Sequence, residues 1–280
     1  MRAGVILAVL GTALAATASA GRLPRLPRPQ LPRIVSINPC VDAVLVRVAD
    51  PAQIAAISHY SQDRRSTSIP LSIAARFTAT SGTAEEVVAL SPDIVIAGGH
   101  VAPPTIAALA RLHIRLVQLP VPASIAESND QIRAIARVTG HADRGERLVA
   151  QVNAAVRAAG NPGHAPIPAL IWQGGGLVPG SGTLADELLR VAGFRNLSAS
   201  YGLQQWDVLP LEYLVARPPR VLLAVGDRDA KQADRMLGHP VLNRLKPSVA
   251  VRDFGERLLH CGGPTIIDAV TRLADVRRSL

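Results

Sequence analysis

Apolar positions along the chain follow two patterns. Short apolar runs, such as 93–97 (D-I-V-I-A), alternate with longer segments in which apolar residues recur at helical spacing. The short runs predict strands buried on both faces, and the longer segments predict amphipathic helices. Their alternation is typical of parallel β-α-β units. The predicted strands of the first half are 33–38, 53–57, 93–97 and 115–119, and its predicted helices are 41–49, 83–90, 104–112 and 124–138.

The longest helical pattern covers residues 143–160. We expect Asp143 to cap its N-terminus, in a capping box with Glu146. We expect Gly160 to end it in a left-handed conformation, because Asn161-Pro162-Gly163 follows and cannot continue a helix. The apolar stripe of this helix consists of Leu148, Val152, Ala155, Val156 and Ala159.

The second half repeats the scheme of the first. Residues 85–97 align without gaps on residues 212–224, with Glu, Val, Ala, Pro and the closing Ala matched, and 47–50 resembles 190–193. Two copies are too few for a solenoid, so we predict an α/β fold of two Rossmann-like lobes with parallel sheets, joined by one long helix. The predicted boundaries are an N-terminal lobe at 33–142, the bridging helix at 143–160 and a C-terminal lobe at 161–280. The predicted strands of the second lobe are 169–173, 220–224 and 249–253, and its predicted helices are 184–192, 211–216, 231–237 and 265–276.

The first twenty residues have the pattern of a secretory signal peptide. Arg2 precedes an apolar core at 5–14, and Ala18-Ser19-Ala20 is a cleavage site. The apolar run is shorter than the ~20 residues of a membrane span. No cysteine directly follows the site, so we expect cleavage after Ala20 and a protein free in the periplasm. Residues 21–32, rich in Arg and Pro, predict an extended arm.

The net charge of +9 raises the question of nucleic-acid binding. The basic residues are scattered, nearly all of them are Arg, and no nucleic-acid-binding motif accompanies them. We therefore expect a solvated basic surface and no nucleic-acid partner.

The Gly-rich loop at 174–182 resembles a phosphate cradle before a helix. No Gly-Lys-Ser/Thr follows it, and Pro179 lies where a nucleophile elbow would need Gly. Because no catalytic constellation is present in the sequence, we do not expect an enzyme.

These motifs, taken in order, resemble the periplasmic substrate-binding proteins of ABC importers, in the branch that takes up cobalamin and ferric siderophores. The resemblance rests on R-I-V-S-I-N-P-C at 33–40, the repeated unit at 85–97 and 212–224, the bridging helix, and G-T-L-A-D-E-L-L-R-V-A-G-F-R-N-L at 182–197. It implies a ligand cleft between two lobes that one rigid helix holds together. The ligand would be a cobalt- or iron-containing chelate, and no cofactor of the protein's own is expected.

The cleft residues follow from sheet topology, because ligands of open α/β sheets lie beyond the carboxyl ends of the strands. Trp206 and Tyr60 match aromatic cleft positions by resemblance, and we expect them to stack on a planar ligand. Trp172, inside a predicted strand, is expected in the core. The predicted ligand-binding residues are Asn38, Cys40, His59, Tyr60, His100, Trp206, Asp227, His260 and Cys261, and the predicted cleft loops also include 98–100 and 172–176.

Three of these residues leave an alternative ligand open. His59, His100 and His260 fall on predicted cleft loops, and imidazole suits Zn and Fe. The alternative function is therefore a haem- or divalent-metal-binding protein of the same architecture. The histidines have no H-x-x-x-H spacing, so we predict no metal site.

The two cysteines, Cys40 and Cys261, follow strands of different predicted lobes. In an oxidising compartment they could form a disulfide, but one across the cleft would oppose opening. Two alternatives stay open: ligand-facing thiols that remain apart, which we favour slightly, or a pair that closes the lobes.

Glu85 and Glu212 occupy the same place in the two repeat units, at the start of a helix. A carboxylate in a first helical turn is favoured by the helix dipole, which explains both residues as local caps. In the resembled family, glutamates at these positions dock on arginines of the permease. The expected partners are therefore a small-molecule ligand and an inner-membrane ABC permease with its ATPase subunits, and we expect a monomer.

Overall fold

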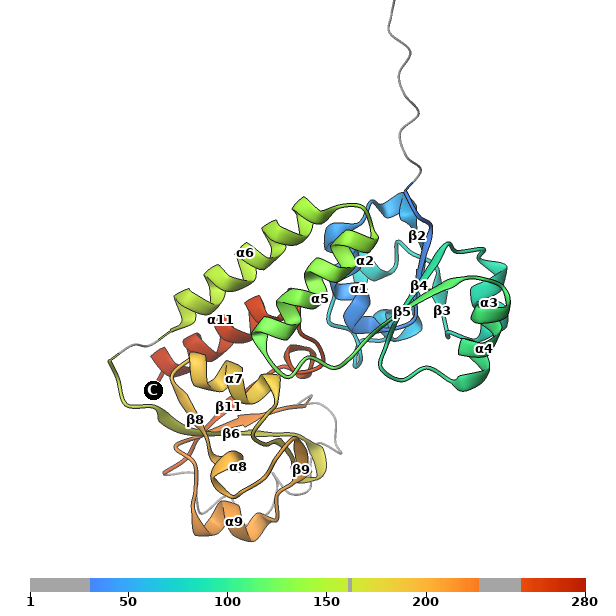
Figure 1. Cartoon of the computed structure of the whole chain (residues 1–280). Coiled ribbons are helices and arrows are strands. Elements are labelled where there is room, and N and C mark those ends of the chain that lie inside the picture. The colour runs from blue at the N-terminus through green and yellow to red at the C-terminus, as the bar shows by residue number, and fades with distance from the viewer. Residues whose placement is uncertain (1–30, 161–162, 227–247) are drawn as a thin grey trace, which may run out of the picture. The chain divides into compact units, whose positions relative to one another are not determined.

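Two parallel sheets form the framework of the computed structural model, which describes residues 31–160, 163–226 and 248–280 (Figure 1). The predicted signal peptide, nearly all of the arm at 21–32, Asp227 and the predicted helix at 231–237 lie outside these residues. Among the described helices, none is long and apolar enough to cross a membrane.

The first sheet has five parallel strands in the order β3-β2-β1-β4-β5. The four strands predicted in this half are confirmed, and the order puts β1 at the centre, where Ile34 and Val35 are fully buried. The fifth strand, β3, is two residues long and too short for an apolar pattern. The strands are β1 (Ile34–Ser36), β2 (Ile54–Ser58), β3 (Ala79–Thr80), β4 (Ile94–Gly98) and β5 (Arg115–Leu119).

The helices of this half begin at identifiable caps. The Thr83 and Ser124 hydroxyls accept hydrogen bonds from the first-turn amides of α3 and α5, as N-cap residues do. The helices are α1 (Pro39–Val48), α2 (Leu71–Ala74), α3 (Ala84–Ala89), α4 (Pro103–Arg111) and α5 (Ile125–Val138), and the short 3-10 helices are η1 (Pro51–Gln53) and η2 (His59–Gln62).

The second sheet has four parallel strands in the order β11-β10-β6-β8. A separate two-stranded antiparallel sheet pairs β7 with β9, although parallel pairing alone was predicted. The missed strands β7, β8 and β9 have three residues each, too few for a recognisable period. The strands are β6 (Ile167–Trp172), β7 (Leu177–Pro179), β8 (Phe194–Asn196), β9 (Trp206–Val208), β10 (Val221–Ala224) and β11 (Ala250–Asp253).

The helices of the second half cover both faces of its sheet. Apolar residues of α7 and α11 join the main core, whereas Leu214 of α9 lies in a separate cluster with Leu222 of β10. The helices are α7 (Leu184–Val191), α8 (Leu197–Ser200), α9 (Leu211–Ala216) and α11 (Thr265–Arg278), and the 3-10 helices are η3 (Gly174–Gly176) and η4 (Glu256–Leu258).

The predicted long helix is confirmed as α6 (Ala142–Ala159), which connects the two halves (Figure 1). Both predicted ends are wrong in detail. His141 is the N-cap residue, and Asp143 lies in the first turn instead. The His141 ring contacts Gln53 Oε1 at 2.9 Å, and the helix begins two residues earlier than the capping box predicted. Gly160 has φ −56° and ψ 151°, an extended rather than left-handed conformation.

One apolar core runs through both halves. Its buried residues come from α1 and the first sheet, from α5 and α6, and from α7, α11 and the second sheet. Gly145 allows α5 and α6 to pack closely, because a Cβ there would lie 2.4 Å from Ala136 Cβ. Residues 31–280 therefore form one compact unit, with Trp172 in the core as expected.

Candidate ligand-binding site

A cavity of about 490 Å³ lies where the carboxyl ends of strands from both sheets converge. Its lining includes Asn38 after β1, Gly99 after β4, Pro120 after β5 and Gln173 after β6. This is the place that the topology of parallel sheets predicts for a ligand.

The N-terminal ends of two helices also reach the cavity. Asn38 caps α1, with its Oδ1 accepting from the amides of Cys40 at 2.9 Å and Val41 at 3.2 Å. Thr183 caps α7 by accepting from the Asp186 amide at 3.1 Å. These amides already have internal acceptors, so neither helix end needs a bound anion to satisfy them.

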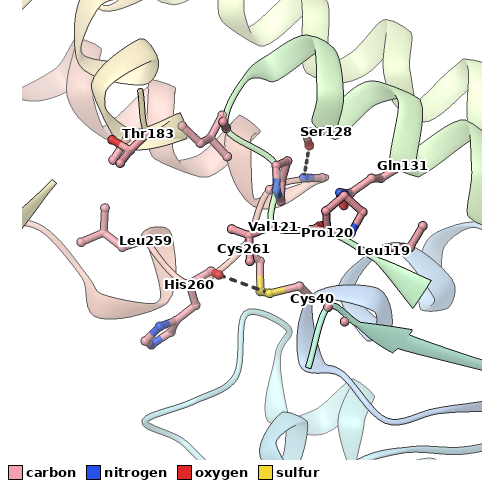
Figure 2. Close-up of a pocket in the computed structure, with 18 of the residues that line it drawn as sticks. Cys40, Leu119, Pro120, Val121, Ser128, Gln131, Thr183, Leu259, His260 and Cys261 are labelled. Carbon is pink, nitrogen blue, oxygen red and sulfur yellow. Dashed lines mark hydrogen bonds between the residues drawn. A yellow bond between two sulfur atoms is a disulfide. The ribbon is translucent and has the colours of Figure 1, made fainter. Parts of the chain in front are cut away.

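In the part of the chain that the structure describes, the lining contains no Asp, Glu, Lys or Arg. Gln131 Nε2 donates to the Pro120 carbonyl at 2.7 Å, which ties α5 to the segment after β5. Figure 2 shows both residues with Leu119, Val121 and Ser128. The polar groups are amides, hydroxyls and imidazoles, from Asn38, His100, Ser128, Gln131, Gln173, Thr183, Gln205 and His260.

Trp206 lies in the cavity lining from the C-terminal side. It begins β9, and 39% of its surface is exposed. A half-exposed indole at a cavity is available to stack on a planar ligand, since its apolar faces gain from leaving water.

Cys40 and Cys261 form a disulfide, so the favoured prediction of separate thiols is wrong (Figure 2). The alternative of a pair is confirmed, but the bond joins the N-terminus of α1 to the segment that leads into α11, at the cavity itself. The Cys40 sulfur also lies 3.2 Å from the His260 carbonyl oxygen. The argument from an opening cleft failed because this segment already packs on the first half of the chain.

Further contacts hold residues 255–263 there. His260 Nε2 donates to the Arg65 carbonyl at 3.0 Å, and Ser68 Oγ donates to the Arg257 carbonyl at 3.2 Å. The Gly263 amide donates to Ser128 Oγ at 2.7 Å. This segment, which we call the stapled segment, therefore closes one side of the cavity with Leu258, Leu259 and His260.

The structure brings together six of the nine predicted ligand-binding residues. Those lining the cavity are Asn38, Cys40, His100, Trp206, His260 and Cys261.

His59 and Tyr60 are not in this lining. They lie on η2, where the rings contact each other and His59 Nδ1 lies 3.2 Å from the Thr80 carbonyl oxygen. The short 3-10 turn after β2 directs them to the surface, and Tyr60 is 50% exposed. Asp227 lies outside the described residues.

Sequence reasoning missed several lining residues. Gln131 and Ser128 lie on α5, a helix for which no ligand contact was predicted. Gln205 precedes a strand that has no readable pattern. The Pro120-Val121-Pro122 segment follows a predicted strand, so the rule applied to the other strands would have found it.

Glu85 and Glu212 lie in the first turns of α3 and α9, as predicted, and both are exposed. Within the described residues neither carboxylate has a hydrogen-bond or ion-pair partner. The neighbouring Glu86 instead makes the local bonds, accepting from Thr80 Oγ1 at 2.8 Å and from the Ser81 amide at 2.7 Å. These bonds hold the pKa of Glu86 below its usual value.

The comparisons with known proteins agree with this architecture. Residues 34–253 match the family model described as periplasmic binding protein, and the chain belongs to that family. A search of the curated proteins finds no match.

Solved structures share the fold at low sequence identity. The periplasmic heme-binding protein RhuT from Roseiflexus is 22% identical, with a TM-score of 0.65 over 88% of this chain and 99% of its own. The periplasmic vitamin B12 binding protein BtuF of Vibrio cholerae is 17% identical, with a TM-score of 0.67 over 89% and 97%. A periplasmic binding protein from Veillonella parvula is 13% identical, with a TM-score of 0.72 over 90% and 93%. The family consists of solute-binding proteins of transport systems.

Proposed function

We propose that this protein captures a cobalamin or related corrinoid, or a ferric siderophore, in the periplasm and delivers it to an inner-membrane ABC permease. The observation that carries the proposal is the cavity between the two sheets, with amide and hydroxyl groups in its walls and Trp206 exposed in its lining. The predicted signal peptide and the family both support export to the periplasm.

The chemistry of the walls favours the corrinoid. A corrinoid carries peripheral carboxamides, which can exchange hydrogen bonds with Asn38, Gln131 and Gln173. Among the described residues these walls offer no Lys or Arg, so a carboxylate placed against them would lose its hydration without gaining an ion pair to either side chain, and that is unfavourable. Haem carries two such carboxylates, and it remains the second candidate because RhuT, a structure of the same fold, binds heme.

A thermal-shift panel tests the ligand class. Purified protein would be heated with cyanocobalamin, dicyanocobinamide, a ferric hydroxamate siderophore, haemin or ZnCl₂. A true ligand at a hundred times its Kd stabilises the protein by about 2.7 kcal/mol, so the melting temperature rises. We expect the shift with the corrinoids, or failing that with the siderophore. A shift with haemin or zinc alone would overturn the proposal in favour of the alternative.

Substitution of Trp206 tests the site. Trp206→Ala should raise the Kd for the ligand roughly tenfold, because one aromatic contact contributes about 0.5–1.5 kcal/mol beyond its buried area. Tyr60→Ala removes an aromatic residue that is even more exposed, at 50%, but lies outside the cavity lining, and it should leave the Kd unchanged. Equal losses in both variants, measured by isothermal titration calorimetry, would place the ligand elsewhere.

Permease docking belongs to the same proposal. Glu85 and Glu212 are carboxylates at matching places in the two repeats, without a partner among the described residues, and each can accept two parallel hydrogen bonds from an arginine of the permease. Glu85→Ala/Glu212→Ala should bind ligand with unchanged Kd but reduce uptake in reconstituted vesicles to the background rate. A matched control, Glu146→Ala/Asp268→Ala, removes two exposed acids that pair with Arg133 and Arg257 and should still support uptake. Full uptake by the Glu85→Ala/Glu212→Ala variant would show that both glutamates act only as helix caps.

A further inference from the structure

Three residues other than glycine have a left-handed backbone in the described residues: Ser91, His113 and Gln205. Ser91 and His113 follow the C-terminal ends of α3 and α4, where a left-handed residue ends a helix. Gln205 ends no helix. Its φ of 54° falls directly before Trp206, in the lining of the cavity.

The loop Gly180-Ser181-Gly182 holds Gln205 in this conformation from three directions. The Gln205 amide donates to the Ser181 carbonyl at 2.9 Å, and the Gly180 amide donates to the Gln205 carbonyl. The Gln205 side chain donates through Nε2 to the Gly182 carbonyl at 3.2 Å. We call these three residues of the loop the clamp.

The clamp requires glycine at position 180. A Cβ on Gly180 would lie 2.4 Å from the Leu203 carbonyl oxygen and 2.8 Å from the Gln204 amide nitrogen. These are backbone atoms, which cannot turn aside as a flexible side chain can. The Gly-rich loop therefore has a structural use that needs no phosphate.

The position of Trp206 depends on Gln205, because the partner of Trp206 in the neighbouring strand forms no ladder hydrogen bond with it. Trp206 pairs with Pro179 in the antiparallel ladder of β7 and β9. The Gly180 amide donates to the Gln205 carbonyl, and the Leu209 amide donates to the Gly176 carbonyl. Hydrogen-bonded and non-hydrogen-bonded pairs alternate along an antiparallel ladder, so the Pro179–Trp206 pair is a non-hydrogen-bonded one. The Pro179 carbonyl is also occupied, by Asn196 Nδ2 at 2.8 Å and by Ser198 Oγ.

We propose that Gln205, locked by the clamp, is the positioning residue that fixes Trp206 at the cavity. The placement of the indole follows from the geometry alone, whereas its consequence for ligand affinity rests on the proposed function. A left-handed residue before the strand turns the chain so that β9 starts at the cavity rather than along the sheet edge.

Fluorescence quenching tests the placement without any ligand. The chain has two tryptophans, and Trp172 is fully buried while Trp206 is 39% exposed, so acrylamide quenching reports mainly on Trp206. Trp206→Phe would confirm that assignment by removing the quenchable component. Gln205→Val should raise the quenching constant and lower the emission anisotropy, because a β-branched residue resists the left-handed region. Gln205→Asn keeps an amide and tolerates that region, so it should restore wild-type quenching.

Unchanged quenching and anisotropy in Gln205→Val would overturn the proposal. Far-UV circular dichroism identifies a variant that fails to fold, and Gly180→Ala then gives a second, independent disruption of the clamp with the same expected change. The corrinoid titration is read separately. Gln205→Val should raise the Kd about tenfold, as Trp206→Ala does. Altered quenching with an unchanged Kd would uphold the positioning role and count against Trp206 as a ligand contact.

Discussion

The two helices whose N-terminal ends reach the cavity, α1 and α7, occupy corresponding places in the two lobes but are anchored differently. The similarity of 47–50 to 190–193 places Asp42 of α1 opposite Ala185 of α7 in the repeat. Ala185 joins the apolar core, as expected for a residue on the inner face of an amphipathic helix. Asp42 is fully buried as well, although it carries a carboxyl group.

The buried carboxyl ties α1 to the end of β2. Asp42 Oδ2 accepts from the Ser58 amide at 2.9 Å and from Ser61 Oγ at 2.6 Å. Its other oxygen has no partner in the described part of the chain. Two positions earlier, Cys40 adds the covalent bond to the stapled segment.

Hydrogen bonds and apolar packing hold the start of α7, and one of these bonds, from the Ile125 amide to Glu187 Oε2 at 2.7 Å, reaches α5 in the first half. Thr183 caps the helix and donates to the Gly180 carbonyl at 3.0 Å, and Asp186 accepts from Asn196 Nδ2 at 3.0 Å. The comparison indicates a cavity with one wall held by a covalent bond and a buried carboxyl, and an opposite wall, which carries Trp206, held by hydrogen bonds and apolar packing without a covalent bond. Adaptation to a ligand is therefore expected on the side of α7.

Among changes that test this difference in anchoring between α1 and α7, removing the disulfide should have the largest effect on stability. The bond closes a loop of 221 residues, and the chain-entropy model gives about 5 kcal/mol of stabilisation for a loop of that size. Cys40→Ser/Cys261→Ser should lower the free energy of urea unfolding by that order. Because the chain has no other cysteine, reduction of the wild-type protein should have the same effect.

The reducing agent added to the double variant is the matched control and should change nothing. A loss below about 1 kcal/mol would show that the hydrogen bonds of the stapled segment suffice, and the two walls would then be equally anchored.

Sequence reasoning predicted the framework of the fold but only part of the site. Apolar runs identified β1, β2, β4, β6 and β10 because a strand buried on both faces must be apolar throughout. The edge strands β5 and β11 were predicted as well, although neither contains a buried residue. The strand-end rule then located Asn38, His100 and Gln173. It could not locate Gln205, because the left-handed backbone there is imposed by contacts with the clamp. Nor could it pair the cysteines, since the pairing depends on how the stapled segment packs.

The titration of Asp42 should produce the next largest effect, a pH dependence of the unfolding free energy that comes from the wall of α1. Burial raises the pKa of Asp42 from 3.8 to about 7, against the smaller lowering effect of the neighbouring polar groups of Ser36, Ser61 and Ser58. A raised pKa means that the folded state holds a proton that the unfolded state has already lost. This contribution to stability is therefore full below about pH 4, falls as the pH rises from about 4 to 7 and is lost above that, a total change of about 4 kcal/mol.

Asp42→Asn removes this titration and should flatten the dependence of unfolding free energy on pH between 4 and 7. Urea unfolding at pH 5 and pH 8 measures this dependence. The difference in unfolding free energy between wild type and variant should change in sign or size between the two pH values. An Asn side chain can still accept the bonds from Ser58 and Ser61 through its oxygen, so the fold should persist. Parallel pH profiles would show that Asp42 is charged at neutral pH and that α1 is held no more tightly than α7.

The smallest effect should come from the caps themselves, and it compares the two walls directly. Thr183→Ala and Asn38→Ala each remove a side chain that accepts from first-turn amides, and each should cost about 1 kcal/mol of stability. Hydrogen exchange separates them. In Thr183→Ala the Asp186 amide loses its acceptor and should exchange faster, because the first turn of α7 has neither a disulfide nor a buried carboxyl and keeps only apolar packing and the bond from the Ile125 amide to Glu187. In Asn38→Ala the disulfide at Cys40 and the buried Asp42 still hold the first turn of α1, so the Val41 amide should lose less protection. Equal loss of protection in both helices would mean that the caps, rather than the disulfide and the buried carboxyl, determine how firmly each wall of the cavity is held.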